Sequence, residues 1–233
     1  MMIVLSGTIG AGKTFLTKRL AKALGTEAFL EPVKGNPILP LFYKGNQMVA
    51  DGKKKTNPYT FLLQIYFLNL RFKMIKKAMS NDNNVLDRSI YEDRLFMKMN
   101  YNMGNTTKEE WTLYKDLLTN MMQELPYAAH KKAPDLMIYL NISLKKQLVH
   151  IKKRGRPYEQ ISTHPNLLNY YKDLQKYYAK WYQQYDYSPK MTVNADDYDV
   201  NQPQDLKKVI QLIKNKLVST GNLKRANDVA QSL

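Results

Sequence analysis

Apolar residues along the chain form two kinds of segment, short continuous runs and longer stretches at helical spacing. The short runs predict buried strands at residues 2–5, 28–30, 85–86, 136–140 and 191–193. In the longer stretches apolar residues recur every three or four positions, which predicts helices over residues 15–24, 59–79, 90–101, 107–124, 144–153, 166–185 and 204–218. Strands and helices that alternate in this way indicate an α/β fold with a parallel sheet.

Two segments near the start of the chain lack a clear period. Residues 36–43 hold two prolines and two aromatic residues, which indicates a loop with a short helix. Residues 44–57 hold Gly45 and three adjacent lysines, so we expect a mobile surface connection there. The length of 233 residues suits a single domain over residues 1–220, followed by a polar tail at 221–233.

Composition narrows the range of functions. The sequence contains no cysteine, which excludes disulfides, thiolate catalysis and cysteine-ligated zinc and suits a reducing cytoplasm. The longest apolar run, residues 61–70, is interrupted by Gln64 and Asn69 and is too short to cross a bilayer. The first residues lead directly into a strand without a charged leader. We therefore expect a soluble, cytoplasmic protein with no membrane partner.

The net charge of +16 raises the question of nucleic-acid binding. The basic residues lie in short separate groups, such as 53–55, 152–154 and 207–208, and do not form one stripe. An excess of charge needs a supporting motif or fold before it indicates such a partner. We therefore do not expect nucleic acid to be a partner.

The segment after the first predicted strand carries a strong chemical signal. It matches the phosphate-loop pattern G-x-x-x-x-G-K-[ST] in the residues Gly7, Thr8, Ile9, Gly10, Ala11, Gly12, Lys13 and Thr14. Glycines let the backbone amides of such a loop surround a polyphosphate, and the following helix points its positive dipole end at the same place. We expect Lys13 to reach the outer phosphates and Thr14 to complete the coordination of Mg²⁺. The pattern predicts a site for a nucleoside triphosphate.

Charged residues also follow the next two predicted strands. Glu31 comes after the second strand, and Asp87 and Arg88 come after the third. Ligands of open α/β sheets bind at the carboxyl ends of the strands, so both carboxylates are expected to face the phosphate loop. Asp87 is typical of a partner of Mg²⁺ in phosphate-loop proteins, and Arg88 places a guanidinium near phosphate.

Gln64 and Arg71 are further candidates on the long helix predicted over residues 59–79. They lie seven positions apart, so they share one face of that helix. If this face points inward, both side chains need polar partners, because an unpaired buried polar group is costly. The spacing alone leaves inward and solvent-facing positions equally open.

Two arginines occur where the helix predicted over residues 144–153 ends. Arg154 and Arg156 flank Gly155, and Pro157 follows directly. Glycine and proline together break the helix, and guanidinium groups match phosphate oxygens bidentately. This arrangement predicts a lid, at about residues 152–160, that closes on phosphate.

Four short motifs stand in order along the chain: Glu31-Pro32-Val33, Gln64, Asp87-Arg88-Ser89 and Arg154-Gly155-Arg156. In this order they resemble the deoxynucleoside kinase family, especially the bacterial deoxyadenosine and deoxyguanosine kinases, over nearly the whole chain. The resemblance implies a P-loop kinase fold, a five-stranded parallel sheet flanked by helices, and a homodimer. It also implies transfer of the γ-phosphoryl group of ATP, with Mg²⁺, to the 5′-hydroxyl of a deoxynucleoside in nucleotide salvage.

The resemblance implies roles in catalysis and in donor binding. Glu31 is similar to the family's general base for the 5′-hydroxyl, a task worth about 10²–10⁴ in rate. Mg²⁺ is implied at Thr14 with Asp87, while the loop amides hold the phosphates of ATP. The charge on the transferring group is offset, by the same resemblance, by Lys13, Arg88, Arg154 and Arg156.

The resemblance also implies residues that bind the acceptor, together with Glu31 and Arg88. Gln64 matches the family's base-reading amide, which donates and accepts in one plane. Arg71 and Asp93 match a charged pair beside the base that favours a purine, as in deoxyadenosine or deoxyguanosine, or a cytosine, as in deoxycytidine. Tyr43 and Glu159 match residues that hold the sugar 3′-hydroxyl. His150 stands where many relatives carry an arginine, and a histidine of ordinary pKa is mostly uncharged at neutral pH.

Two other functions compete with this one. A nucleoside monophosphate kinase of the thymidylate type also has a phosphate loop, an Asp-Arg motif and an arginine lid. Its charged acceptor would call for an arginine near position 31, whereas Glu31 suits a neutral hydroxyl. A nucleic-acid-associated ATPase is the second alternative, but no guanine-reading N-K-x-D element or second motor domain occurs in the sequence.

Overall fold

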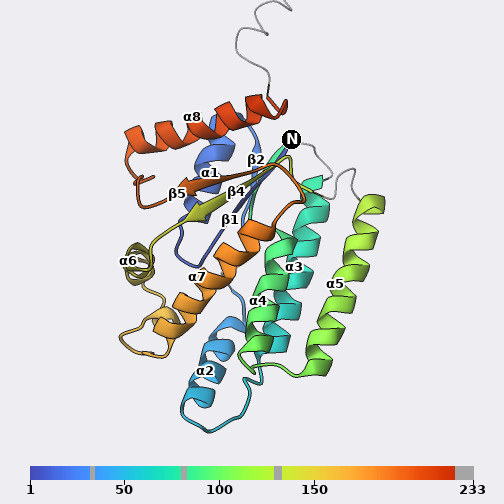
Figure 1. Ribbon diagram of the computed structural model, residues 1–233, viewed down its shortest axis with the longest axis vertical. Helices are drawn as coiled ribbons and strands as arrows, with labels where there is room; N and C mark the ends of the chain where they lie inside the picture. Colours follow the sequence, from blue (N-terminus) through green and yellow to red (C-terminus); the bar gives the residue numbers. More distant parts are fainter. Residues whose placement is uncertain (32–34, 80–82, 129–132, 224–233) are drawn as a thin grey trace, which may run out of the picture.

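The computed structural model describes residues 1–31, 35–79, 83–128 and 133–223 (Figure 1). Pro32 and Val33 of the first motif lie outside these residues, as does the part of the predicted tail beyond residue 223. Among the described residues, no helix has the length and apolar character needed to span a membrane.

Five parallel strands form one sheet in the order β2, β3, β1, β4, β5. Their bounds are β1 Met2–Gly7, β2 Glu27–Phe29, β3 Asn84–Asp87, β4 Leu136–Asn141 and β5 Lys190–Asn194. Parallel neighbours cannot be joined by tight turns, so helices connect them across the faces of the sheet. The five-stranded parallel sheet expected from the resemblance is therefore confirmed.

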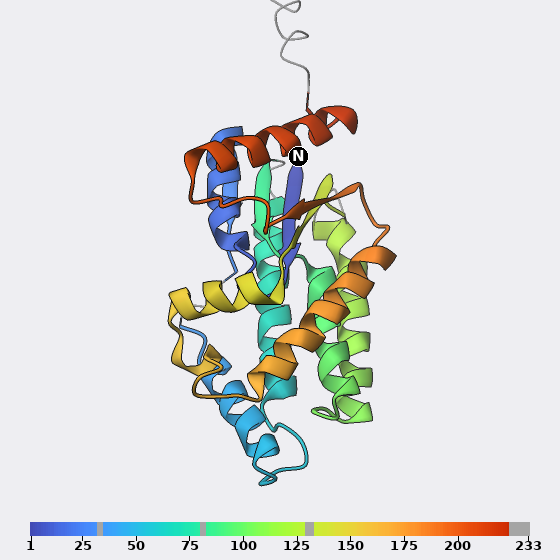
Figure 2. The same cartoon turned by 60° about the vertical axis from the view of Figure 1, so that its left-hand side comes forward.

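Helices cover both faces of the sheet, because its strands are apolar on both sides (Figure 1, Figure 2). In β1, Ile3 and Leu5 pack against helices on one face, whereas Met2 and Val4 pack against helices on the other. The first face carries α1 (Lys13–Leu24) and α8 (Pro203–Ser219). The opposite face carries α3 (Thr60–Met79), α4 (Ile90–Asn102) and α5 (Lys108–Ala128).

A third apolar cluster joins the helices that Figure 1 shows beyond the carboxyl ends of the strands. Leu63, near the start of α3, and Leu95 and Met99 of α4 belong to it. The other elements that contribute are α2 (Leu39–Ala50), α6 (Leu144–Arg154), the 3₁₀ turn η1 (Pro157–Glu159) and α7 (Leu167–Gln184). These elements stand around the sheet edge to which the phosphate loop belongs. The fold therefore encloses the ligand side of the sheet with helices.

The prediction of an irregular connection over residues 44–57 is wrong in its first half. Residues 44–50 continue α2, and Gly45 is a buried position inside that helix. A side chain at Gly45 would collide with the amide of Asn57, which donates a hydrogen bond to the carbonyl of Phe42 over 2.8 Å. Gly45 therefore permits close approach of the chain and does not end the helix.

Candidate active site

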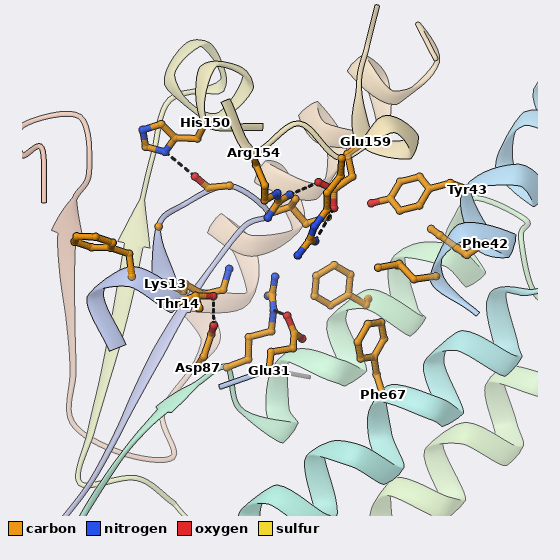
Figure 3. Close-up of a pocket in the computed structure, with 18 of the residues that line it drawn as sticks. Lys13, Thr14, Glu31, Phe42, Tyr43, Phe67, Asp87, His150, Arg154 and Glu159 are labelled. Carbon is orange, nitrogen blue, oxygen red and sulfur yellow. Dashed lines mark hydrogen bonds and ion pairs between the residues drawn. The ribbon is translucent and has the colours of Figure 1, made fainter. Parts of the chain in front are cut away.

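A cavity of about 480 Å³ opens at the carboxyl edge of the sheet (Figure 3). We call the end formed by Gly7–Thr14 and Asp87 the loop end, and the end formed by α2, α3 and α4 the helix end. Glu31 lies between the two ends. Most of the predicted site residues line the cavity, and those that lie behind its wall are Gly7, Thr8, Ala11 and Arg71.

The loop end depends on two glycines, Gly12 for its backbone conformation and Gly10 for a close approach. Gly12 caps α1 with φ of 94°, a left-handed conformation that side chains disfavour. Gly10 has φ of 81°, and a Cβ atom there would lie 3.1 Å from the carbonyl oxygen of Gln147. Helix α6 therefore packs directly on the loop, and the start of α1 points at the cavity, which is the arrangement that favours bound phosphate.

Lys13 is a buried cation without a carboxylate in direct contact among the described residues. Its Nζ donates to the carbonyl oxygens of Gly7 and Thr8, over 2.9 and 2.8 Å. Burial, followed by the positive charge of Arg88, lowers the pKa of Lys13 to about 7. Negative charge bound at the loop end would raise this pKa again, so Lys13 is suited to an anionic ligand.

Thr14 and Asp87 lie together at the loop end, as predicted. The Thr14 hydroxyl donates a hydrogen bond to Oδ2 of Asp87. Oδ1 of Asp87 is buried and has no hydrogen-bond partner in the part of the chain that the structure describes. Burial raises the pKa of Asp87. An orphaned carboxylate oxygen beside a hydroxyl is a donor set that fits a hard cation such as Mg²⁺.

Glu31 accepts from two arginines. Arg71 Nη2 donates to Glu31 Oε1 over 2.7 Å, and Arg88 Nε donates to Glu31 Oε2 over 3.1 Å. Burial opposes ionisation of Glu31, but the charges of Arg88, Arg71 and Lys13 outweigh it and lower the pKa to about 2. Glu31 is therefore an ionised carboxylate held in place at both oxygens.

Arg71 and Asp93 form the predicted pair across α3 and α4. Arg71 Nε donates to Asp93 Oδ2 over 3.3 Å, and Nη1 donates to the Asp87 carbonyl over 2.8 Å. Arg71 is only 2% exposed, so its face of α3 points inward. Burial raises the pKa of Asp93 to about 6, against the opposing effect of Arg71. The question left open by the helical spacing is settled in favour of the inward position.

Gln64 lines the helix end of the cavity. Its side chain is buried, and no hydrogen bond within the described residues engages the amide. Aromatic and aliphatic residues form the surrounding wall, namely Phe42, Tyr43, Leu63, Phe67, Phe96 and Tyr170. A free amide in an apolar wall suits a flat ligand that both stacks and forms hydrogen bonds.

Arg154 and Arg156 both bind Glu159. Arg154 ends α6, and its Nη2 forms an ion pair with Glu159 Oε2, while Arg156 Nη1 lies 3.1 Å from Glu159 Oε1. The arginine side chains are about one third exposed, whereas Glu159 is buried. The hydroxyl of Tyr171 donates to the Glu159 carbonyl over 2.9 Å. The three predicted residues are thus brought together, and the arginines neutralise a carboxylate of the cavity wall.

His150 contacts the phosphate loop from α6. Its Nδ1 lies 2.8 Å from the carbonyl oxygen of Gly10, and Nδ1 donates this hydrogen bond because a carbonyl oxygen only accepts (Figure 3). The ring also lines the cavity. The histidine at this position therefore joins α6 to the loop end.

Comparison with known proteins identifies the family. Residues 3–219 match the family described as deoxynucleoside kinase. The chain belongs to the deoxynucleoside kinase family. This kinase is 52% identical to a deoxyguanosine kinase of Lactobacillus acidophilus, over 95% of this chain and 93% of the relative. It is 50% identical to a deoxyadenosine kinase of the same organism, over 95% of this chain and 99% of the relative.

Solved structures confirm the P-loop kinase fold of this kinase. A deoxyadenosine kinase from M. mycoides with the products dCMP and dCDP bound is 34% identical, with a TM-score of 0.73. The match covers 94% of this chain and 100% of that chain. The same enzyme with bound dATP gives 36% identity and a TM-score of 0.71, over 93% and 99% of the two chains.

Several side chains of this site escaped prediction from the sequence. Phe67 and Phe96 line the helix end of the kinase, and the Arg88 guanidinium lies 5.0 Å from the ring centre of Phe96. Glu92 is fully buried and binds Arg88 over 3.2 Å, with Tyr178 beside it. Glu92 had a detectable signal, since the sequence Ser89-x-x-Glu92 is a helix capping box. Phe67, Phe96 and Tyr178 had no such signal in the sequence.

Proposed function

We propose that this kinase transfers the γ-phosphoryl group of ATP to the 5′-hydroxyl of a purine deoxynucleoside, deoxyadenosine or deoxyguanosine. The observation that carries the proposal is the position of Glu31 between a phosphate-binding loop end and an apolar helix end with a free amide. A purine acceptor is supported by two relatives that share about half of their residues with this chain. They are named deoxyguanosine kinase and deoxyadenosine kinase.

At the loop end, the amides of Gly7–Thr14 would bind the phosphates of ATP, with Lys13 as the counter-charge. Thr14 and Asp87 would hold Mg²⁺, and the orphaned oxygen of Asp87 supports this assignment. Bound Mg²⁺ supplies positive charge that offsets the charge of the β- and γ-phosphates.

Glu31 would act as the base for the acceptor hydroxyl. An ionised carboxylate accepts a hydrogen bond from the 5′-hydroxyl and takes its proton as the oxygen attacks phosphorus. Arg88 Nε holds Glu31, and Nη2 of Arg88 has no acceptor within the described residues. Nη2 is therefore available to the oxygens of the transferring group, a contact that can be worth ~10³–10⁵ in rate.

Residues 152–160 would form the lid. Arg154 and Arg156 would exchange part of their contact with Glu159 for the oxygens of ATP, since guanidinium groups bind phosphate bidentately. The acceptor sugar would then take the place of the arginines beside Glu159. Glu159 and Tyr43 would bind its 3′-hydroxyl. The partial exposure of the two arginines beside the buried Glu159 supports such an exchange.

At the helix end, Gln64 would read the base edge between Phe67 and Phe96. The pair Arg71 and Asp93 would favour a purine, or a cytosine as in deoxycytidine, over thymine. We further propose a homodimer in the cytoplasm, where a chain without cysteine suits the reducing conditions.

Separate assays with deoxyadenosine, deoxyguanosine, deoxycytidine and thymidine test the proposal, each with ATP and Mg²⁺. We expect the highest kcat/KM with one of the two purines. A parallel assay with dAMP and dTMP separates this function from a nucleoside monophosphate kinase. Phosphorylation of the monophosphates alone would contradict the proposal, and light scattering of the purified protein tests the dimer.

A further inference from the structure

Arg88 has a strained backbone in a fixed position. It is the one non-glycine residue with positive φ, 74°, in the described part of the chain. Its backbone amide nevertheless donates to the carbonyl of Leu5 over 2.9 Å, which continues the pairing between β1 and β3. A residue stays in such a conformation only when its surroundings hold it there, and strain of this kind gathers at functional sites.

The side chain of Arg88 is held from behind by Glu92 and Tyr178. Glu92 Oε1 accepts from Arg88 Nη1 over 3.2 Å and from the Tyr178 hydroxyl over 2.9 Å. The same Nη1 also donates to the Tyr178 hydroxyl. Glu92 Oε2 accepts from the amide of Ser89 over 2.8 Å. Glu92 and Tyr178 are both 0% exposed, so these bonds form without competition from water.

Glu92 and Tyr178 do not line the cavity, in contrast to Arg88 and Glu31. They therefore act on the reaction only through Arg88. The two remaining hydrogen bonds of the guanidinium show which groups Arg88 positions. Its Nε binds Glu31 over 3.1 Å, and its Nη1 binds the Gly7 carbonyl over 3.1 Å. A buried carboxylate is stable only when hydrogen bonds and charges compensate it, and Glu92 meets both conditions.

We propose that Glu92 and Tyr178 are positioning residues that set the orientation of Glu31 through Arg88. Glu92 comes from the first turn of α4 and Tyr178 from α7, so the network ties both helices to the carboxyl end of β3. The inference rests on the proposed role of Glu31 as the base. A shift of about 1 Å in a reacting group can lower a rate ~10²-fold, which makes such support relevant to catalysis.

The variant Tyr178→Phe tests the proposal, because it removes one hydroxyl and keeps the buried ring. We expect kcat to fall about tenfold to a hundredfold, with the KM values for ATP and deoxynucleoside within about twofold of the wild type. Tyr185→Phe is the matched control, since Tyr185 is also buried and its hydroxyl binds Ser188 over 2.8 Å. Glu92→Gln is expected to reduce kcat at least as much, although it also disturbs the cap of α4.

A double-variant cycle with Glu31→Gln separates positioning from a purely structural role. If Tyr178 acts through Glu31, Tyr178→Phe lowers kcat little further in the Glu31→Gln background. An equal loss in both backgrounds, or a normal kcat for Tyr178→Phe alone, would overturn the proposal. A normal kcat for Glu31→Gln would instead overturn the role of Glu31 itself, so the two failures give different results. Thermal unfolding of each variant shows whether a loss of kcat reflects unfolding.

Discussion

The loop end and the helix end of the cavity are built in different ways. The loop end is one continuous segment in which Lys13 binds the carbonyls of Gly7 and Thr8 in its own loop. At the helix end, Arg71 joins Asp93 and Glu31, which lie 22 and 40 positions away along the chain. The proposed phosphate site is thus encoded locally, whereas the proposed acceptor site depends on the packing of α3 against α4. Changes at the loop end should affect all substrates alike, and changes at the helix end should affect their ranking.

Lys13→Met is expected to have the largest effect. Removal of the buried cation should lower kcat/KM about 10³-fold or more for every deoxynucleoside, because charge on the donor phosphates is no longer offset. Steady-state kinetics with each acceptor measures this, with Lys18→Met, an exposed lysine on the same helix, as the control. A loss confined to one base would contradict the division between the two ends.

Glu31→Gln should follow in size. We expect kcat to fall about 10²–10⁴-fold, since the amide cannot take the proton of the 5′-hydroxyl. The affinity for ATP, measured by calorimetry, should change far less. Glu27→Gln is the matched control, because Glu27 is exposed on β2, the strand that precedes Glu31. Equal losses in turnover and in ATP affinity would remove Glu31 as the base.

The double variant Arg71→Met with Asp93→Ala should change the ranking of bases. Contacts that read a base edge are worth about 1–3 kcal/mol each. The preference for the purine deoxynucleoside over thymidine should therefore shrink about tenfold to a hundredfold. The measurement is the ratio of kcat/KM between the purine and thymidine, which is insensitive to a general loss of rate. Arg94→Met, an exposed change on α4, serves as control. An unchanged ratio would show that the pair has a structural role only.

The pKa of Lys13 predicts that the affinity of the loop end for ATP depends on pH. In the free enzyme this pKa is about 7, and bound phosphate should raise it. Below pH 7 Lys13 is already protonated, so ATP affinity should be constant there. Above pH 7 binding must take up a proton, and affinity should fall by up to about tenfold per pH unit. Calorimetry between pH 6 and pH 9 tests this, and Lys13→Met should remove the dependence.

Gly45→Ala should have the smallest effect and act through stability. Helix propensity alone favours alanine by about 1 kcal/mol, but the methyl group would collide with Asn57. Overpacking of this kind lowers the free energy of unfolding by about 1–3 kcal/mol. Denaturant unfolding measures it, with Lys44→Ala as an exposed control in the same helix. A stabilised variant would contradict the tight packing of α2.

The predictions from the sequence succeeded where a signal is local. Glu31 and Asp87 could be assigned to one sheet edge because parallel strands present their carboxyl ends together. The spacing of Gln64 and Arg71 marks a shared helical face, but periodicity does not say which side of the helix is buried. Gly45 was misinterpreted for a related reason, since its role depends on Asn57 and not on its neighbours in sequence.

The sequence by itself determined the alternation of strands and helices in an α/β fold, the phosphate-loop pattern of Gly7–Thr14 and the approximate positions of the strand ends. Each of these follows from patterns within a few consecutive residues. Only the tertiary structure decided that Glu31 is held by Arg71 and Arg88, and that Glu92 and Tyr178 support Arg88 from behind. Apart from the pair Arg88 and Glu92, which lie four positions apart, these contacts join residues that are distant along the chain. Their geometry exists only once the helices have packed.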